Sequence, residues 1–309
     1  MTKTILLATV ATLASTAAFA EVTYVGGNYD FGYNQFDDDA GDLTVVTGDL
    51  TYDFEYAIDA WTLGAQLNGY SLGLGTDGDV DETMTAAALT VYGAYAVTND
   101  WTVVAGIEGV DVEGENETFY RVGAEYALNN YTFGAGVYTY DAGSDDETVP
   151  YVFADYKDGG YAATFAIAQY DETVLVNVDS AFDMGTYAGG LELMYMDDDG
   201  NSIYTLTGFG DYALNDQYTI GLEAEYGEIL DMASTSRIAL VGGYDFTDTV
   251  SAKVSLGQAR YEAGNDDVTA GTLGFMIDYE FGAPSVTTFD AVPSVTEYVG
   301  EFALNLGAL

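Results

Sequence analysis

Hydrophobic and polar residues alternate with a period of two along most of this 309-residue chain. From Tyr187 to Tyr195 the odd positions hold Tyr, Gly and Leu, whereas the even positions include Ala188, Glu192 and Met194. Successive side chains of a β-strand point to opposite faces, so this pattern predicts a strand with one apolar and one mixed face. No helical period competes with it between residues 21 and 281. That stretch is therefore predicted to be all-β.

Sixteen segments of this kind are separated by turn signals. The predicted strands are 22–34, 43–56, 61–74, 83–97, 101–112, 118–128, 131–141, 148–157, 161–170, 173–182, 186–196, 202–213, 217–227, 234–246, 249–260 and 268–281. The breaks are rich in Asn, Asp and Gly, which supply the positive φ angles that tight hairpin turns need. Short breaks, such as Asn129-Asn130, alternate with generally longer and more acidic ones, such as residues 76–82. The even strand number puts both ends of the sheet on the side of the short turns.

A single sheet of sixteen hairpin-connected strands would expose two edges unless it closed on itself. In a closed transmembrane barrel the apolar face meets lipid and the polar face lines the lumen. Aromatic residues such as Trp61, Trp101 and Tyr131 crowd beside the short turns, and amphipathic rings are typical of the membrane–water boundary. The sequence thus predicts a transmembrane antiparallel up-and-down β-barrel of about sixteen strands over residues 21–281. The alternative is a soluble secreted β protein with aromatic strand ends.

The N-terminus has the features of a cleaved secretory signal peptide. Lys3 precedes an apolar run from Ile5 to Leu13, and Ala18-Phe19-Ala20 has the A-x-A form of a signal-peptidase site. Residues 1–20 are therefore expected to be removed during export. No later stretch approaches the roughly 18 consecutive apolar residues that a transmembrane helix needs.

The composition is strongly acidic and lacks two reactive residue types. The chain has 51 acidic and 6 basic residues, a formal net charge of -45, and no His or Cys. Catalysis by imidazole or thiolate, His/Cys metal sites and disulfides are thereby excluded. Such a charge repels phosphate backbones, so nucleic acid is not an expected partner. With 49% hydrophobic residues, the chain also lacks the composition of a disordered polyanion.

The sequence resembles the Gram-negative outer-membrane porins of the general-diffusion type. The resemblance rests on the signal sequence, the sixteen alternating segments, the alternation of short turns with polar loops, and the last strand. In that last strand, one face carries Leu273, Phe275, Ile277, Tyr279 and Phe281. This face is similar to the C-terminal β-signal that the barrel assembly machinery reads. The resemblance implies location in the outer membrane of a Gram-negative bacterium, passive diffusion of small hydrophilic solutes, and commonly a homotrimer.

Two features depart from that family. Porins of this type usually end at the terminal aromatic residue, whereas this chain continues for 28 residues beyond Phe281. Their third extracellular loop usually folds into the pore, but here the third longer connection, residues 113–117, is too short to do so. A different constriction or a wide pore is therefore expected.

Charged residues fall on the polar face of the predicted strands, which is expected to line the lumen. The predicted pore-lining acids are Asp49, Asp53, Glu55, Glu108, Glu125, Glu192, Glu223, Glu225, Asp278 and Glu280, and the predicted pore-lining cations are Arg121, Arg237 and Lys253. An excess of lumen acids concentrates cations and repels anions, so a cation-preferring channel is predicted. Small residues at other inward positions, such as Gly123, Gly190 and Gly274, are expected to leave space for water.

Two other functions are alternatives to a channel. A non-conducting barrel, structural or adhesive, has the same strand pattern and differs in how its lumen is filled. A hydrolase would need a general base, and no residue pair in the sequence is identifiable as one. We therefore expect no enzyme and no cofactor, and we retain the non-conducting barrel as the alternative to the channel.

Two acidic loop segments invite a calcium interpretation. The candidate ligands are Asp77, Asp79, Asp81, Asp197 and Asp199. Hard carboxylate oxygens suit Ca²⁺, but their spacing does not follow the twelve-residue EF-hand loop and no flanking helices are predicted. The preferred interpretation is a solvated acidic outer surface, and no metal site is expected.

The tail, residues 282–309, breaks the two-residue period. Pro284 and Pro293 interrupt strand pairing and mark a linker. Beyond it, Val295, Tyr298, Val299, Phe302 and Leu306 recur at helical spacing on one face. An amphipathic helix that plugs the lumen or docks on the rim, a frayed tail and a seventeenth strand are the three interpretations.

Overall fold

The structure, a computed structural model, describes residues 22–36, 43–76, 82–112, 115–141, 146–170, 173–198, 201–229, 233–263 and 266–282. The strands in these ranges are β1 (Val22–Phe36), β2 (Leu43–Ile58), β3 (Trp61–Thr76), β4 (Glu82–Ala96), β5 (Trp101–Val112), β6 (Glu115–Leu128), β7 (Tyr131–Asp141), β8 (Asp146–Asp158), β9 (Tyr161–Tyr170), β10 (Thr173–Asp183), β11 (Tyr187–Asp198), β12 (Asn201–Ala213), β13 (Tyr218–Ile229), β14 (Ala233–Thr247), β15 (Val250–Ala263) and β16 (Asp266–Gly282). The predicted signal peptide and the tail from residue 283 lie outside the described residues.

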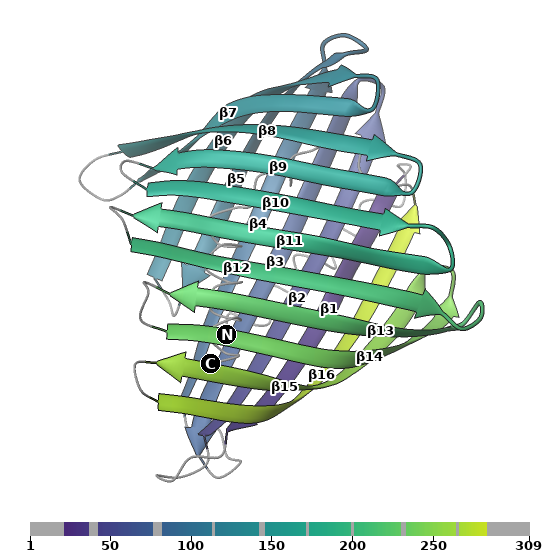
Figure 1. The fold of residues 1–309 in the computed structure, drawn as a ribbon. Coiled ribbons are helices and arrows are strands. Elements are labelled where there is room, and N and C mark those ends of the chain that lie inside the picture. Colours follow the sequence, from purple (N-terminus) through teal and green to yellow (C-terminus); the bar gives the residue numbers. More distant parts are fainter. Residues whose placement is uncertain are drawn as a thin grey trace, which may run out of the picture.

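The strands form one closed barrel in which each strand is antiparallel to both neighbours. β1 closes the ring by pairing with β16, from Tyr24 opposite Gly282 to Phe36 opposite Ala270. The strands of the two walls cross at an angle, as tilted strands of a barrel do (Figure 1). The predicted fold class is confirmed, and each predicted strand agrees with the observed one to within three residues. In the part of the chain that the structure describes, no helix is long and apolar enough to cross a membrane.

The short turns have the backbone that their residues predict. Asp59 and Asn129 adopt φ angles of 52° and 55°, and Gly159 and Gly185 adopt 58° and 77°. Positive φ matches the twist of a two-residue hairpin turn to that of its strands, and Asn, Asp and Gly tolerate it best. These turns let each strand return beside the previous one without a crossover.

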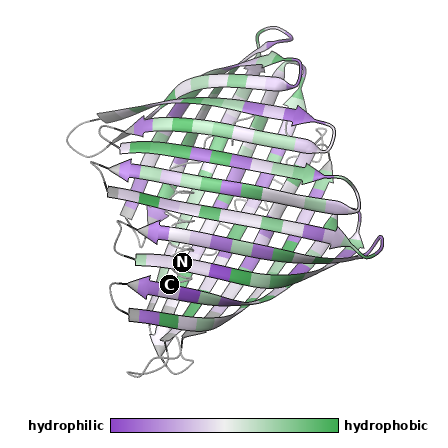
Figure 2. Cartoon of the chain, viewed as in Figure 1, coloured by the Kyte–Doolittle hydropathy of each residue, from purple (hydrophilic) through white to green (hydrophobic). Residues whose placement is uncertain are grey.

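Side chains alternate between an exposed outer face and a more buried inner face. In β14, Ile238 and Leu240 are 59% and 58% exposed, whereas Ala239 and Val241 are 2% and 8% exposed. The alternation of hydropathy along the strands is visible in Figure 2. Because lipid offers no hydrogen bonds, an apolar outer face with fully paired backbone is what a membrane-spanning barrel requires.

Aromatic residues beside the short turns meet in pairs across neighbouring strands. Each ring pair joins the two strands of one hairpin, from β3 and β4 to β13 and β14. The pairs are Trp61–Tyr95, Trp101–Tyr126, Tyr131–Tyr156, Tyr161–Phe182, Tyr187–Tyr212 and Tyr218–Tyr244. Their ring centroids lie between 4.7 and 6.5 Å apart, within the range of favourable aromatic contacts. We call these six pairs the aromatic girdle. It follows β3 to β14 near the short-turn end of the barrel, where amphipathic rings would lie at a headgroup boundary.

Candidate functional site in the barrel interior

The thirteen charged residues predicted to line the lumen all lie on the inward face of their strands. Glu55, Glu108, Arg121 and Glu125 are among the most buried, with exposed fractions of 3% to 7%. Glu280, near the end of β16, is exposed. The period-two pattern was therefore sufficient to place these charges on one face. Their role as the lining of an open aqueous pore stays a prediction.

On the inner face of the barrel, one side-chain hydrogen bond joins β2 and β4 across the intervening strand β3. The Tyr92 hydroxyl on β4 donates to a carboxylate oxygen of Glu55 on β2. Gly64 lies between them on β3, in register with both. A Cβ at Gly64 would come within 2.0 Å of the Tyr92 ring, so the ring occupies the place of the missing side chain. Glycine at this position is thus required for the Tyr92 side chain to reach Glu55.

Arg121 lies over two neighbouring tyrosine rings on the inner face of β6 to β8. Its guanidinium carbon is 5.0 Å from the ring centroid of Tyr138 and 4.8 Å from that of Tyr151. Arg121 Nε also donates a hydrogen bond of 3.1 Å to the Tyr151 hydroxyl oxygen. A cation over an aromatic face is attracted by the ring quadrupole, most strongly where water is excluded. Arg121 is 6% exposed, so this contact lies in a largely dry part of the interior.

The expectation that inward glycines leave open space was wrong at three positions. The Tyr151 hydroxyl oxygen lies 2.4 Å from where a Cβ of Gly123 would be. The Phe209 ring comes within 2.5 Å of the same point at Gly190, and the Ser255 hydroxyl within 2.3 Å at Gly274. A glycine in a strand often marks the close approach of another group, and here that group is a neighbouring inward side chain.

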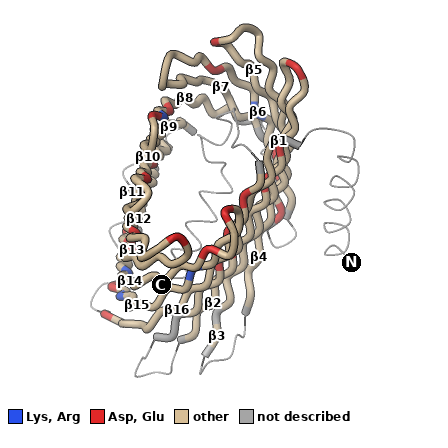
Figure 3. Tube along the Cα trace, turned by 90° about the vertical axis from the view of Figure 1, so that its right-hand side faces the viewer, with Lys and Arg blue, Asp and Glu red and all other residues tan. Residues whose placement is uncertain are grey.

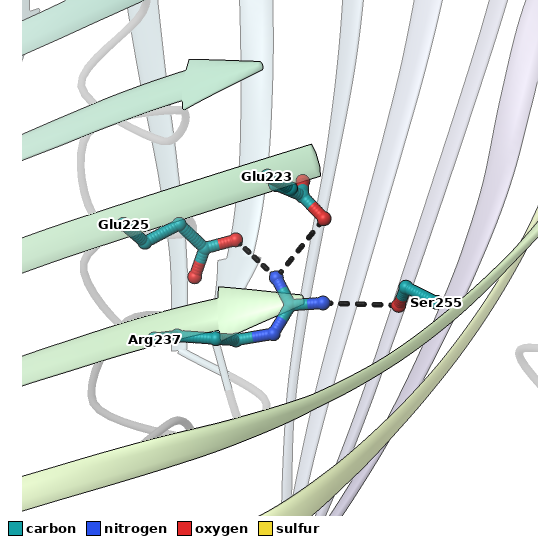
Figure 4. Close-up of polar contacts among 4 residues, drawn as sticks. All are labelled: Glu223, Glu225, Arg237 and Ser255. Carbon is teal, nitrogen blue, oxygen red and sulfur yellow. Dashed lines mark hydrogen bonds and ion pairs between the residues drawn. The ribbon is translucent and has the colours of Figure 1, made fainter. Parts of the chain in front are cut away.

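A second cluster of charges surrounds Arg237 on β14 (Figure 4). Its Nη1 lies 3.2 Å from a carboxylate oxygen of Glu223 and forms a further ion pair with Glu225, both on β13. Its Nη2 donates a hydrogen bond of 3.0 Å to the hydroxyl of Ser255 on β15. The three charged side chains are 14% to 27% exposed. One cation between two acids leaves this cluster with net negative charge.

Lys253 on β15 completes the set of predicted inward cations. Its Nζ lies 3.3 Å from a carboxylate oxygen of Asp211 on β12 and 5.9 Å from the Phe209 ring centroid. Inward cations therefore pair locally with inward acids at Arg237 and Lys253. Because each engages at least one acid, neither offers an uncompensated positive charge to the lumen.

Sequence reasoning missed several inward acids, among them Asp30, Asp155, Asp179 and Asp211. On β8, the inward neighbours of Asp155 are Tyr151 and Phe153, which are as apolar as the outward Val152. The alternation of hydropathy is therefore weak in that strand. The outward position of Val152 would still have placed Asp155, three residues later, on the inward face. For Asp30 and Asp211 the parity of Tyr29 and Tyr212, both exposed on the outer face, was an available signal.

One end of the interior opens into a cavity of about 740 Å³ beside the short turns. Its acidic lining residues are Asp53, Asp216, Asp245, Asp248, Asp278 and Glu280. Three of these were predicted to line the lumen. Of the other three, Asp245 lies near the end of β14, and Asp216 and Asp248 lie in the turns after β12 and β14. No Lys or Arg contributes to this lining.

The calcium candidates receive no support from the described residues. Within the ranges that the structure describes, no group of three or more acidic side chains is arranged to hold a metal ion. Asp197 accepts a hydrogen bond of 3.1 Å from the Tyr195 hydroxyl. Asp77, Asp79, Asp81 and Asp199 lie outside the described residues.

Comparison with known proteins identifies the fold and leaves the sequence family open. No family model matches the chain, and no curated protein matches its sequence. Among solved structures, Pseudomonas aeruginosa OccK7 (OpdD) is similar with a TM-score of 0.51 and 8% identity, covering 84% of this chain and 99% of that one. Pseudomonas aeruginosa OccK2 (OpdF) is similar with a TM-score of 0.51 and 10% identity, covering 84% and 98%. The chain thus has the porin-like barrel fold of these proteins.

Proposed function

We propose that this protein is an outer-membrane channel through which small hydrophilic solutes diffuse passively, with a preference for cations. The observation that carries the proposal is the charge of the inward face: its acids outnumber its cations, which in the described strands are Arg121, Lys157, Arg237 and Lys253. Fixed negative charge in a narrow, low-dielectric passage raises the local concentration of cations and lowers that of anions. The acidic cavity beside the short turns extends this charge to one mouth of the barrel.

The closed sixteen-stranded barrel supports a channel in the outer membrane. Barrels of 16 to 18 strands are wide enough to hold water inside, unlike eight-stranded barrels, which side chains fill. The similarity to OccK7 and OccK2 supports the same location. Contact with outer-membrane lipid, delivery by a cleaved signal peptide, folding by the barrel assembly machinery and a homotrimeric assembly belong to this proposal.

Conductance of the purified protein in a planar lipid bilayer tests the proposal directly. A KCl gradient across the bilayer should produce a reversal potential of the sign that K⁺ selectivity requires. The preference should weaken at about 1 M salt, where the screening length falls to about 3 Å. A reversal potential of the opposite sign would contradict the cation preference and leave the channel itself standing.

A non-conducting structural barrel is the second candidate, and one observation favours it. Tyr138, Tyr151, Phe153 and Leu175 form a buried apolar cluster on the inward face of β7, β8 and β10. Bulky inward side chains reduce the space available to water. The same bilayer experiment separates the two functions, because a filled barrel would insert without producing conductance steps.

A further inference from the structure

The strand register places seven inward polar residues directly beside one another. The residues of this acidic row are Asp155, Thr164, Asp179, Glu192, Thr207, Glu225 and Arg237, one from each strand of β8 to β14. Each is the direct cross-strand partner of the next. Acidic positions recur from strand to strand along this wall (Figure 3). No apolar residue interrupts the row over these seven strands.

The acidic row runs obliquely from one end of the barrel to the other. Asp155 lies three residues before the end of β8 at a short turn, and Arg237 lies near the opposite end, four residues after the start of β14. Neighbouring strands are about 4.8 Å apart, so six steps cover about 29 Å. Because strands of such barrels tilt by about 40°, the row rises by roughly 18 Å along the barrel axis. It therefore spans most of an apolar band about 25 Å tall.

The inward row on the side of the longer connections carries no charge. In register order it consists of Phe153, Ala166, Asn177, Met194, Thr205, Gly227 and Thr235. Toward the longer connections, the acidic row is therefore bordered by uncharged residues. A cation that follows the lowest potential through this part of the lumen would stay close to the row.

Basic side chains form ion pairs with the acids near the two ends of the row, but not with the two acids in its middle. Lys157 Nζ lies 3.6 Å from a carboxylate oxygen of Asp155, and Arg237 pairs with Glu225. Asp179 and Glu192 are directly opposed on β10 and β11, and among the described residues neither forms an ion pair with a basic group. Like charges directly opposite each other are destabilising. A cation between the two carboxylates would remove that repulsion.

Asn177 gives a second, independent indication of a ligand at this point. It is the next inward residue before Asp179 on β10 and is 7% exposed. Its Oδ1 accepts no hydrogen bond from any residue that the structure describes. A buried carbonyl oxygen without a donor is costly, and a cation is one of the partners that can satisfy it. Two carboxylates and an amide oxygen are hard ligands that suit Mg²⁺ or Ca²⁺.

We propose that the acidic row is the path along which cations cross the lumen, and that a partly hydrated divalent cation pauses between Asp179 and Glu192 beside Asn177. This inference rests on the proposed channel function. Three ligands are fewer than a closed metal site provides, and Mg²⁺ keeps several waters when protein ligands are few. The ion should therefore bind briefly and slow the passage of K⁺ while it is bound.

Block of K⁺ current by Mg²⁺ tests the inference on the full mature protein. In about 0.1 M KCl, where the screening length is about 10 Å, millimolar Mg²⁺ should lower the single-channel K⁺ current of the wild type. The double substitution Asp179→Asn with Glu192→Gln should raise the half-blocking Mg²⁺ concentration by about tenfold. The single substitution Glu192→Gln should raise it by less, and it provides a second variant if the double substitution does not assemble.

A matched control removes the same charge from the opposite wall. Asp53 and Glu280 are inward acids on β2 and β16, separated in register only by Gly26. The substitution Asp53→Asn with Glu280→Gln should lower the cation preference while keeping most of the Mg²⁺ block. Equal loss of block in both double variants, or no block in the wild type, would overturn the path and leave the channel function intact. Absence of any conductance would overturn the channel and the path together.

Discussion

Arg121 and Tyr151 are joined twice inside the barrel. The guanidinium donates a hydrogen bond of 3.1 Å to the phenol oxygen, and it also lies 4.8 Å from the centroid of the same ring. The phenol oxygen fills the space above Gly123 and Gly136, where a Cβ would approach it to within 2.4 and 2.3 Å. One side chain therefore orients a buried cation and packs against two strands that have glycine at those points.

The substitution Tyr151→Phe separates these roles. It removes the hydrogen bond to Arg121 but keeps the ring, so the free energy of unfolding should fall by about 1.5–3 kcal/mol, as for a lost bond to a charged group. Tyr151→Ala should cost more, about 3–5 kcal/mol, because it also leaves a cavity. Urea-induced unfolding from lipid vesicles, followed by gel mobility, measures both. Equal stability of the wild type and the Phe variant would show that the hydrogen bond contributes nothing.

The fold followed from the sequence because the membrane imposes a rule on one face. Outward residues such as Ile238 and Leu240 must be apolar, which makes the two-residue period visible and lets the strands be counted. The inward face obeys no such rule. Where it is apolar as well, as at Tyr151 and Phe153, the alternation fades and Asp155 was missed.

The interior contacts depended on register, which hydropathy does not encode. Opposition of Asp179 and Glu192 is set by the hairpin turn between β10 and β11, and a shift of one residue would turn one of them outward. The sequence placed Gly123 inward but could not reveal that a tyrosine two strands away covers it. Such contacts come from cross-strand neighbours that are far apart in the chain.

The aromatic girdle should contribute measurable pairwise stability. Trp61 and Tyr95 are direct cross-strand partners with ring centroids 4.7 Å apart. A double-mutant cycle with Trp61→Ala and Tyr95→Ala should give a coupling energy of about 0.5–1.5 kcal/mol. Additive losses in the two single variants would mean that each ring interacts with the lipid boundary and not with the other ring.

Adjacent glycines in one turn should respond differently to alanine. Gly159 has a φ of 58°, and nothing lies within 4 Å of its missing Cβ, so Gly159→Ala should cost about 1–2 kcal/mol of backbone strain. At Gly160 a Cβ would come within 1.9 Å of the Asp183 carbonyl oxygen, which is backbone and cannot rotate away. Gly160→Ala should therefore reduce stability and the yield of folded barrel more than Gly159→Ala does. The opposite order would contradict the close approach of β10 to this turn.

Neutralising Arg237 should increase cation preference. Arg237 holds Glu223 and Glu225 in ion pairs, and Arg237→Gln would leave two inward carboxylates without that countercharge. The cation-to-anion permeability ratio from reversal potentials should rise, whereas Glu225→Gln should lower it. One variant removes a positive charge and the other a negative charge from the same cluster. Opposite shifts of the permeability ratio would therefore indicate an electrostatic effect. Shifts in the same direction would point to a change of pore shape instead.

Removal of the tail tests where the barrel ends and whether residues 283–309 enter the lumen. Each strand pair of the closed barrel lies within residues 22–282, and the closing pair reaches Gly282 opposite Tyr24. A chain that stops after Gly282 keeps the aromatic strand end at Phe281 and should therefore assemble into a barrel of unchanged heat-modifiable gel mobility. If the amphipathic spacing of Val295, Tyr298 and Phe302 forms a helix that plugs the lumen, single-channel conductance should rise after truncation. Unchanged conductance with normal assembly would favour the frayed tail or docking on the barrel rim. Failure to assemble would mean that β16 is not the last strand that the barrel needs, and the seventeenth-strand interpretation would then replace the helix.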